Sequence, residues 1–160
     1  MPEPTCQIVP ATLPLVRQMA PRLRAADTAE VWAARHWTPL EALEQSVALS
    51  PMPRALLING QPAAAWGVEP IARLAGVGCS WLLGTDLVAS HPMIFWRTCK
   101  AELERMLTVW RVVLNWIQFE YQASIRWARR LGFRVDEPRP FGPDGVLFCC
   151  AAIVADTGAR

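Results

Sequence analysis

Cysteine and histidine are the residue types in this sequence that could bind a metal ion or carry out redox chemistry. The chain has 160 residues and five cysteines, an odd number, and no two of them have the Cys-x-x-Cys spacing of a metal or redox pair. The cysteines are Cys6, Cys79, Cys99, Cys149 and Cys150. Cys149 and Cys150 are adjacent in an apolar run, so on a strand their side chains would point to opposite faces. We therefore expect buried thiols in a reducing compartment rather than a redox or metal pair.

The two histidines, His36 and His91, lie far apart in the sequence. Neither has a carboxylate at the spacing that a metal site requires. We therefore expect no bound metal.

Basic residues gather at one place, at Arg126, Arg129 and Arg130. Arg126 and Arg130 are four residues apart and would share one face of a helix. Cations near a helix C-terminus are stabilised by its dipole, so a solvated helix face is the expected role. A contact with a partner or a phosphate is the alternative, but three arginines are too few for a DNA-binding surface.

Composition and charge exclude several function classes. The chain is 52% hydrophobic and 19% charged, with a net charge of +2, which favours a folded core and disfavours nucleic-acid or membrane-surface binding. The longest apolar stretch, from Met106 to Ile117, is interrupted by polar residues, so we expect no transmembrane helix. Residues 1–4 lack a basic flank followed by an apolar run, so we expect no secretory signal.

Helical patterns dominate the first third of the chain. After a short strand over 5–9, apolar periodicity predicts a helix over 13–25, which Pro21 breaks or kinks, and a second over 27–36. Thr38, followed by Pro39 and Glu41, is typical of a capped helix start, and that helix ends near residue 50.

The middle of the chain has the pattern of an antiparallel meander. Strands are predicted over 54–58, 63–68 and 79–88. Asn59-Gly60 is a strong signal for a tight hairpin between the first two of these strands. Residues 76–78, Gly-Val-Gly, predict a second turn before the third strand.

The last third alternates helices and strands. We predict a helix over 92–108 capped by Ser90, a buried strand over 111–117, and a helix over 121–131 closed by Gly132. A strand begins at Arg134, residues 136–145 form a loop, and 146–154 is the last strand. The chain is thus expected to be one domain over 1–160: a helical part over 1–53, a sheet core over 54–154 and a polar tail. Its fold class is α+β, with helices on both faces of a mixed, mostly antiparallel sheet of six to seven strands.

The order of elements and one motif resemble the GNAT (Gcn5-related N-acetyltransferase) superfamily. The motif is residues 122–134, Gln-Ala-Ser-Ile-Arg-Trp-Ala-Arg-Arg-Leu-Gly-Phe-Arg, in which a short helix after a strand ends in Leu-Gly-Phe. Asn59-Gly60 and Trp66-Gly67 extend the resemblance, which covers about residues 54–154. It implies a GNAT-like fold.

Other segments are similar to GNAT-like proteins of tailed bacteriophages, some of which are named internal virion proteins of T7-like phages. These segments are residues 80–85, His91-Pro92, Leu114-Asn115 and residues 124–127. The similarity implies a role in or around a phage particle, with phage or protein subunits as partners. The location would then be the host cytoplasm or a virion.

The GNAT resemblance implies acetyl-CoA as cofactor, held by its pyrophosphate on a Gly-rich loop at a helix N-terminus. The expected loop, residues 89–93, has no glycine, and Pro92 removes an N–H donor. The predicted cofactor contacts are Leu87, Val88, Ser90, His91, Arg97 and Asn115. Arg73-Leu-Ala-Gly-Val-Gly78 fits the loop pattern, but no helix pattern follows it, so a hairpin turn is favoured over a phosphate cradle.

The family often uses a tyrosine to protonate the departing thiolate, and Trp127 stands at that position here. The candidate catalytic residues are therefore Tyr121, the only tyrosine, and the carboxylates Glu69 and Asp86 as bases. A structural role remains the alternative for each of the three.

Two functions remain open at this point. One is a GNAT-fold protein that no longer transfers acetyl groups and has a structural or binding role, as the missing glycines, the phage-like segments and eight tryptophans suggest. The other is an acyl-CoA-dependent N-acetyltransferase acting on an amine, with the reaction between two splayed strands near 82–86 and 113–115. The GNAT-type architecture is common to both.

Overall fold

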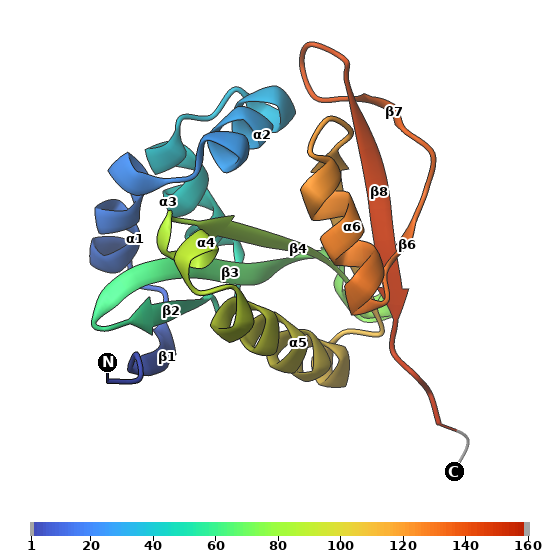
Figure 1. Ribbon diagram of the computed structural model, residues 1–160. Coiled ribbons are helices and arrows are strands. Elements are labelled where there is room, and N and C mark those ends of the chain that lie inside the picture. Colours follow the sequence, from blue (N-terminus) through green and yellow to red (C-terminus); the bar gives the residue numbers. More distant parts are fainter. Residues whose placement is uncertain (1, 159–160) are drawn as a thin grey trace.

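The computed structural model describes residues 2–158 and consists of one central sheet with helices on both faces (Figure 1). The strands are β1 (Cys6–Pro10), β2 (Arg54–Ile58), β3 (Gln61–Ala72), β4 (Val77–Gly84), β5 (Val112–Gln118), β6 (Arg134–Val135), β7 (Arg139–Phe141) and β8 (Val146–Val154). The helices are α1 (Leu13–Met19), α2 (Ala25–Arg35), α3 (Pro39–Leu49), α4 (Leu87–Ser90), α5 (Pro92–Val109) and α6 (Gln122–Leu131). The α+β class and the mostly antiparallel sheet are confirmed.

The sheet has the strand order β1-β2-β3-β4-β5-β8-β6, and β7 pairs with β8 beside this path. All pairs are antiparallel except β4 with β5. Because β1 pairs with β2, the sheet begins at Cys6, well before the predicted start of the sheet core at residue 54.

Two hydrophobic clusters fasten helices to opposite faces of the sheet. On one face, α1 and α3 pack through Val16, Met19 and Leu43 against small side chains of β2 and β3. On the other face, α5 packs against the sheet through Phe95, Cys99 and Met106. Helix α6 packs there through a third cluster, around Ile125. The alternation of strand side chains between the two faces produces this arrangement.

Local signals in the sequence place several element ends correctly. Thr38 and Glu41 form the predicted capping box at the start of α3. Asn59 and Gly60 both have positive φ, as a tight hairpin turn requires, and Gly132 ends α6 in the left-handed conformation.

Three predicted elements are wrong. β4 ends at Gly84 instead of residue 88, because the Thr85 hydroxyl bonds the carbonyls of Pro62 and Ala63 and the chain then forms α4. Ser90 is consequently the last residue of α4 and does not cap α5, whose N-cap is His91. The predicted loop over 136–145 contains β7, a short edge strand that tolerates proline because only one of its edges is paired.

The pairing between β4 and β5 stops early, and this separation shapes the rest of the molecule. It includes Val77 with Val112, Gly78 with Val113 and Cys79 with Leu114, after which the two strands diverge. The Ser80 hydroxyl donates to the Leu114 carbonyl at 3.0 Å just where they part. An open gap therefore lies between the last halves of two central strands.

Helix α2 lies across the open end of this gap and bonds both strands. The Gly84 N–H donates to Asp27 Oδ2 at 2.8 Å, and the Gly84 carbonyl accepts from the Arg24 N–H at 2.9 Å. On the other strand, the Gln118 N–H donates to Glu30 Oε2 at 2.9 Å. Asp27 is only 2% exposed, and its charge is balanced by Arg24, whose Nη2 lies 2.8 Å from Oδ2.

The Arg24–Asp27 pair should therefore stabilise the fold far more than the exposed pair Arg17–Glu44. Replacing Asp27 with Ala leaves the half-buried guanidinium of Arg24 and the buried Gly84 N–H without this partner. We expect a loss of about 3 kcal/mol in the free energy of unfolding. Glu44→Ala breaks a pair whose arginine is 56% exposed and should cost less than about 1 kcal/mol. Urea unfolding of the two variants gives both values, and equal losses would contradict the role assigned to Asp27.

Candidate active site

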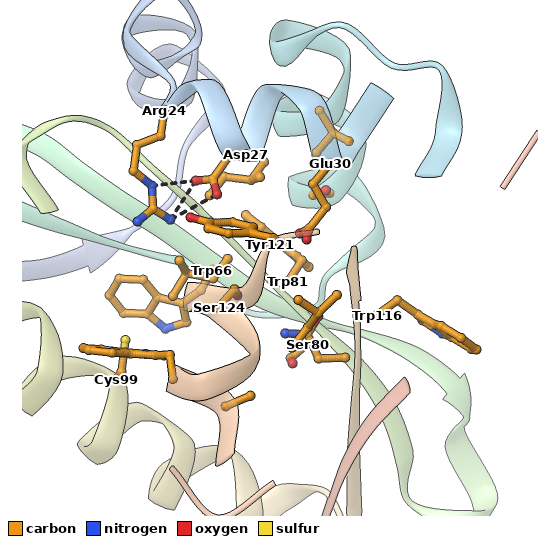
Figure 2. Close-up of a pocket in the computed structure, with 18 of the residues that line it drawn as sticks. Arg24, Asp27, Glu30, Trp66, Ser80, Trp81, Cys99, Trp116, Tyr121 and Ser124 are labelled. Atoms are coloured by element: carbon orange, nitrogen blue, oxygen red, sulfur yellow. Dashed lines mark hydrogen bonds and ion pairs between the residues drawn. The ribbon is translucent and has the colours of Figure 1, made fainter. Parts of the chain in front are cut away.

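A cavity of about 440 Å³ occupies the gap between β4 and β5 (Figure 2). Its lining residues come from both faces of the sheet, from α2 and α3 on one side and from α5 and α6 on the other. Two chemically different surfaces thus meet at the gap. We call them the α2 face and the α5 face.

Main-chain groups of both strands face the gap. The N–H and carbonyl of Gly84 point into it, because they bond α2. On β5, the Gln118 N–H also bonds α2, whereas the Gln118 carbonyl accepts from the Tyr121 N–H. Main-chain N–H and carbonyl groups point to alternate sides along a strand. Leu82 lies two residues before Gly84 and Trp116 two residues before Gln118, so their N–H and carbonyl groups also point into the gap. No strand pairing reaches these two residues across the gap. The gap can therefore accept an extended ligand that carries amide groups of its own.

The α5 face is mainly aromatic, with a few hydroxyl and amide groups. Phe95 of α5 stacks on Trp127 of α6, with ring centroids 5.2 Å apart, and Trp96 meets the same indole edge-on at 5.0 Å. These contacts join α5 to α6. Polar groups on this face include Ser80 and Asn115 from the strands, Ser124 from the first turn of α6, and Thr98 and Glu102 from α5.

The α2 face combines aromatic side chains with charged groups. Its aromatic lining residues are Trp37, Trp81, Trp116, Phe141 and Phe148. Phe141 stacks on Trp116 with centroids 4.4 Å apart. The β7–β8 hairpin that carries Phe141 is tied to the end of α2, where His36 Nε2 lies 2.7 Å from Asp144 Oδ2.

Four charged or ionisable side chains meet beneath α2: Arg24, Asp27, Glu30 and Tyr121 (Figure 2). The Tyr121 hydroxyl points toward the Arg24–Asp27 pair. Burial, followed by the negative charge of Asp27, raises the pKa of Tyr121 to about 12. Burial also raises the pKa of Asp27, although Arg24 and the Gly84 N–H oppose it.

Burial raises the pKa of Glu30 to about 7, against the effect of the Gln118 N–H, which lowers it. The negative charge of Asp27 adds to the rise and Arg24 reduces it. A carboxyl group that titrates near neutral pH can accept and release a proton under physiological conditions.

The loop after β4 offers few donors for a phosphate group. The N–H groups of Val88, Ala89 and His91 already bond carbonyls within residues 85–88, because the segment forms the helical turn α4. Pro92 has no N–H to contribute. The free donors at the start of α5 are thus fewer than a Gly-rich loop would supply.

The segment Arg73–Gly78 is a hairpin connection between β3 and β4, as predicted. Residues 73–75 form a single 3-10 turn, Gly76 has φ of +68°, and Val77 and Gly78 already pair in the sheet. No helix follows it, so it has no phosphate-binding geometry.

The cavity brings together only some of the residues that the sequence singled out. Val88, Asn115, Glu69 and Tyr121 line it, and Glu69 lies 4.0 Å from Arg35. Five others do not line it: Asp86, Leu87, Ser90, His91 and Arg97. Asp86 is exposed at the start of α4, and Arg97 is exposed on α5.

Sequence reasoning missed Asp27, Glu30 and Ser124. Asp27 and Glu30 are spaced i, i+3, so both lie on the same side of α2, but only the fold shows that this side faces the gap. Ser124 lies in the quoted GNAT-like motif, where its position in the first turn of α6 was the available signal.

Cys99, Cys149 and Cys150 are buried, as predicted, and Cys79 is half-buried, whereas Cys6 is exposed on the edge strand β1. Burial raises the pKa of the Cys79 thiol to about 11 and that of Cys99 to about 12, so both are protonated at neutral pH. Across residues 2–158, no group of three or more His, Cys, Asp or Glu side chains is placed to hold a metal ion. In the same range, no helix is long and apolar enough to cross a membrane.

Comparison with known proteins gives no matching family model and no matching curated relative. Solved structures do match. RimL, a ribosomal L7/L12 alpha-N-protein acetyltransferase in complex with coenzyme A, is 13% identical with a TM-score of 0.73, covering 95% of each chain. A GNAT-family acetyltransferase from Streptococcus pneumoniae is 10% identical with a TM-score of 0.65, covering 94% of this chain and 99% of that one.

A third structure, the ribosomal-protein-S18-alanine N-acetyltransferase from Escherichia coli, is 15% identical with a TM-score of 0.65. The match covers 98% of this chain and 97% of that one. None of these three is a phage protein, so the phage-like segments find no counterpart among them. Together the three similarities show that the chain has the fold of the GNAT acetyltransferases.

Proposed function

We propose that this protein is an acyl-CoA-dependent N-acyltransferase that transfers an acyl group to an amine. The observation that carries the proposal is the cavity between β4 and β5, which two different surfaces line at the point where the strands part. A transferase that joins two substrates needs such a site, because most of its rate enhancement comes from holding both in one orientation.

The acyl donor fits the α5 face and the gap itself. The pantetheine arm of acetyl-CoA is an extended chain with two amide groups, and it would supply the thioester. The main-chain groups of Leu82 and Trp116 are oriented to pair with such amides, and Ser80, Asn115 and Ser124 add side-chain partners. A main-chain N–H in the gap is also suited to stabilise negative charge on the thioester oxygen.

The acceptor fits the α2 face. RimL acts on ribosomal protein L7/L12, and another matched structure is a ribosomal-protein-S5-alanine acetyltransferase from Vibrio fischeri. By analogy, a protein N-terminus is one acceptor class, and a small primary amine is the other. Trp37 and Trp81 provide apolar surface for the group that carries the amine.

Without transfer, a binding or structural role is the second candidate, and a specific observation favours it. The stack of Phe95, Trp127 and Trp96 joins α5 to α6 over the face where the donor should enter, and the loop after β4 has no glycine. Placing such a role in a phage particle is supported only by the similarity of the short segments.

Acetyl-CoA should stabilise the wild-type protein against heat. A ligand at 100 times its Kd adds about 2.7 kcal/mol, which corresponds to a rise in Tm of roughly 5–10 °C for a chain of this size. Ser124→Trp fills the α5 face and should abolish the rise, whereas Gln122→Trp, on the exposed side of the same helix turn, should retain it. Ala89→Trp provides a second blocking variant if Ser124→Trp fails to fold. No rise for the wild type at millimolar acetyl-CoA would support the second candidate.

The phosphate groups of the donor should contribute little to its binding. The turn α4 already uses the N–H groups of Val88, Ala89 and His91, and Pro92 has none. We therefore expect acetyl-CoA to bind less than about 10-fold more tightly than acetyl-pantetheine, a difference below about 1.4 kcal/mol. Isothermal titration calorimetry with both ligands measures the ratio. A preference of a thousandfold would mean that a phosphate site forms elsewhere.

A further inference from the structure

Glu30 differs from Asp27 in how its carboxylate is used. Asp27 has both oxygens occupied, because Arg24 Nε and Nη2 donate to them at 2.9 and 3.1 Å and the Gly84 N–H donates as well. Within residues 2–158, the Gln118 N–H is the one hydrogen-bond donor that contacts Glu30, at Oε2. Asp27 therefore has a structural role, whereas the Glu30 carboxylate can still accept further hydrogen bonds or a proton.

The free capacity of Glu30 is directed into the cavity. Its side chain descends from α2 into the pocket between the two strands (Figure 2), and it is one of the lining residues. The bond to Gln118 fixes its position on the β5 side of the gap, opposite Gly84 and Asp27 on the β4 side. An amine that enters from the α2 face would meet this carboxylate before it reached the gap.

The other carboxylates near the gap are less suited to take a proton there. Glu102 of α5 lines the cavity, but its Oε2 accepts from Trp66 Nε1 at 2.9 Å and from Arg105 Nε at 3.1 Å. Glu69 lies on β3, with its side chain 31% exposed, and it faces Arg35 at 4.0 Å. Asp86 is exposed and outside the cavity lining. Tyr121 directs its hydroxyl to the Arg24–Asp27 pair and has a pKa of about 12, so it is no base near neutral pH.

We propose that Glu30 is the catalytic residue that takes the proton from the acceptor's ammonium group before transfer. The inference rests on the proposed N-acyltransferase function. In the balanced step, Glu30 accepts one proton from R–NH3⁺, and the resulting amine forms a C–N bond to the thioester carbon. The C–S bond then breaks, the second nitrogen proton passes to the thiolate to give CoA-SH, and Glu30 releases its proton to solvent.

The surroundings of Glu30 indicate which amine it can serve. Asp27, Arg24 and Tyr121 are the ionisable groups that face it. Burial, the Gln118 N–H and the charges of Asp27 and Arg24 together leave the pKa of Glu30 at about 7. An α-amino group has an ordinary pKa of about 7.7–8.0, so proton transfer to Glu30 is nearly balanced. A lysine side chain, at about 10.4, would require a far less favourable transfer. A peptide with a free N-terminus is therefore the better probe.

Glu30→Gln should lower kcat/KM for acetylation of a peptide with N-terminal alanine by about 10²- to 10³-fold, the usual contribution of a general base. Glutamine still accepts the Gln118 N–H, so the fold and acetyl-CoA binding should be retained. Glu44→Gln, the same change at a glutamate outside the cavity lining, should alter kcat/KM less than about threefold. In the wild type, kcat/KM should rise with increasing pH, with an apparent pKa near 7, as Glu30 loses its proton. This rise should be absent from Glu30→Gln.

The outcomes separate the two proposals. A wild type that transfers the acetyl group, with Glu30→Gln retaining both its rate and its pH limb, would overturn the role of Glu30 and leave the function standing. A wild type that acetylates neither the alanine peptide nor 2-phenylethylamine would overturn both. A loss of rate in Glu30→Gln together with loss of acetyl-CoA binding would show a structural role and also overturn the assignment.

A stability measurement tests the position of Glu30 without any substrate. Its pKa is about 7 in the folded chain, against an ordinary value of 4.5, so between these values the folded state binds more protons than the unfolded state. The urea midpoint of the wild type should therefore fall as pH rises from 5 to 8. Glu30→Gln should show a smaller fall, because the remaining decline comes from Asp27 and other groups. Identical slopes would mean that Glu30 is not buried in the gap.

Discussion

The parting of β4 from β5 is the constraint on which the rest of this structure depends. Two central strands that separate lose their mutual hydrogen bonds, and unpaired main-chain groups in a buried place are costly. At the far ends of the gap, α2 supplies the missing partners, with Asp27 at Gly84 and Glu30 at Gln118. Because a buried carboxylate is itself unfavourable, Arg24 is required beside Asp27.

Helix α2 both stabilises the separated strands and contributes an ionisable side chain, Glu30, to the cavity. The helix that holds the strands apart also closes the wide end of the gap and carries an ionisable group into the cavity. Within residues 2–158, strand pairing across the gap does not extend to its middle, around Leu82 and Trp116. The main-chain N–H and carbonyl groups of Leu82 and Trp116 are thus free to bind a ligand, and a ligand with amide groups can supply their hydrogen-bond partners.

The two faces of the cavity are built from different kinds of element. On the α5 face, stacked aromatic rings join α5 to α6, and the segment after β4 forms the helical turn α4. On the α2 face, the wall includes the exposed β7–β8 hairpin, which contacts α2 through the pair His36–Asp144 and through Gly142, which lies close to the Ala33 and Ala34 carbonyls. For the proposed transferase, the exposed loop on the α2 face makes variation in acceptor size easier to accommodate than variation in the donor.

Elements whose ends depend on local chemistry were predictable. Thr38 with Glu41, Asn59-Gly60 and Gly132 act within a few residues, so the sequence reveals them directly. The predicted strand over 79–88 was wrong because its end depends on a distant contact, that of Thr85 with Pro62 and Ala63. Likewise, β7 forms by pairing with β8. Pro140 favoured the prediction of a loop there, because proline is rare inside strands.

The sequence by itself determined the class of fold and the order of most elements, and it singled out Tyr121 and Glu69, which line the cavity. The tertiary structure alone decided that Asp27 and Glu30 face the gap, more than fifty residues away in sequence from the strand groups they bond. It also assigned the Tyr121 hydroxyl to the Arg24–Asp27 pair. The physical reason is that a carboxylate's pKa and partners are set by burial and by contacts distant in sequence, which no local pattern records.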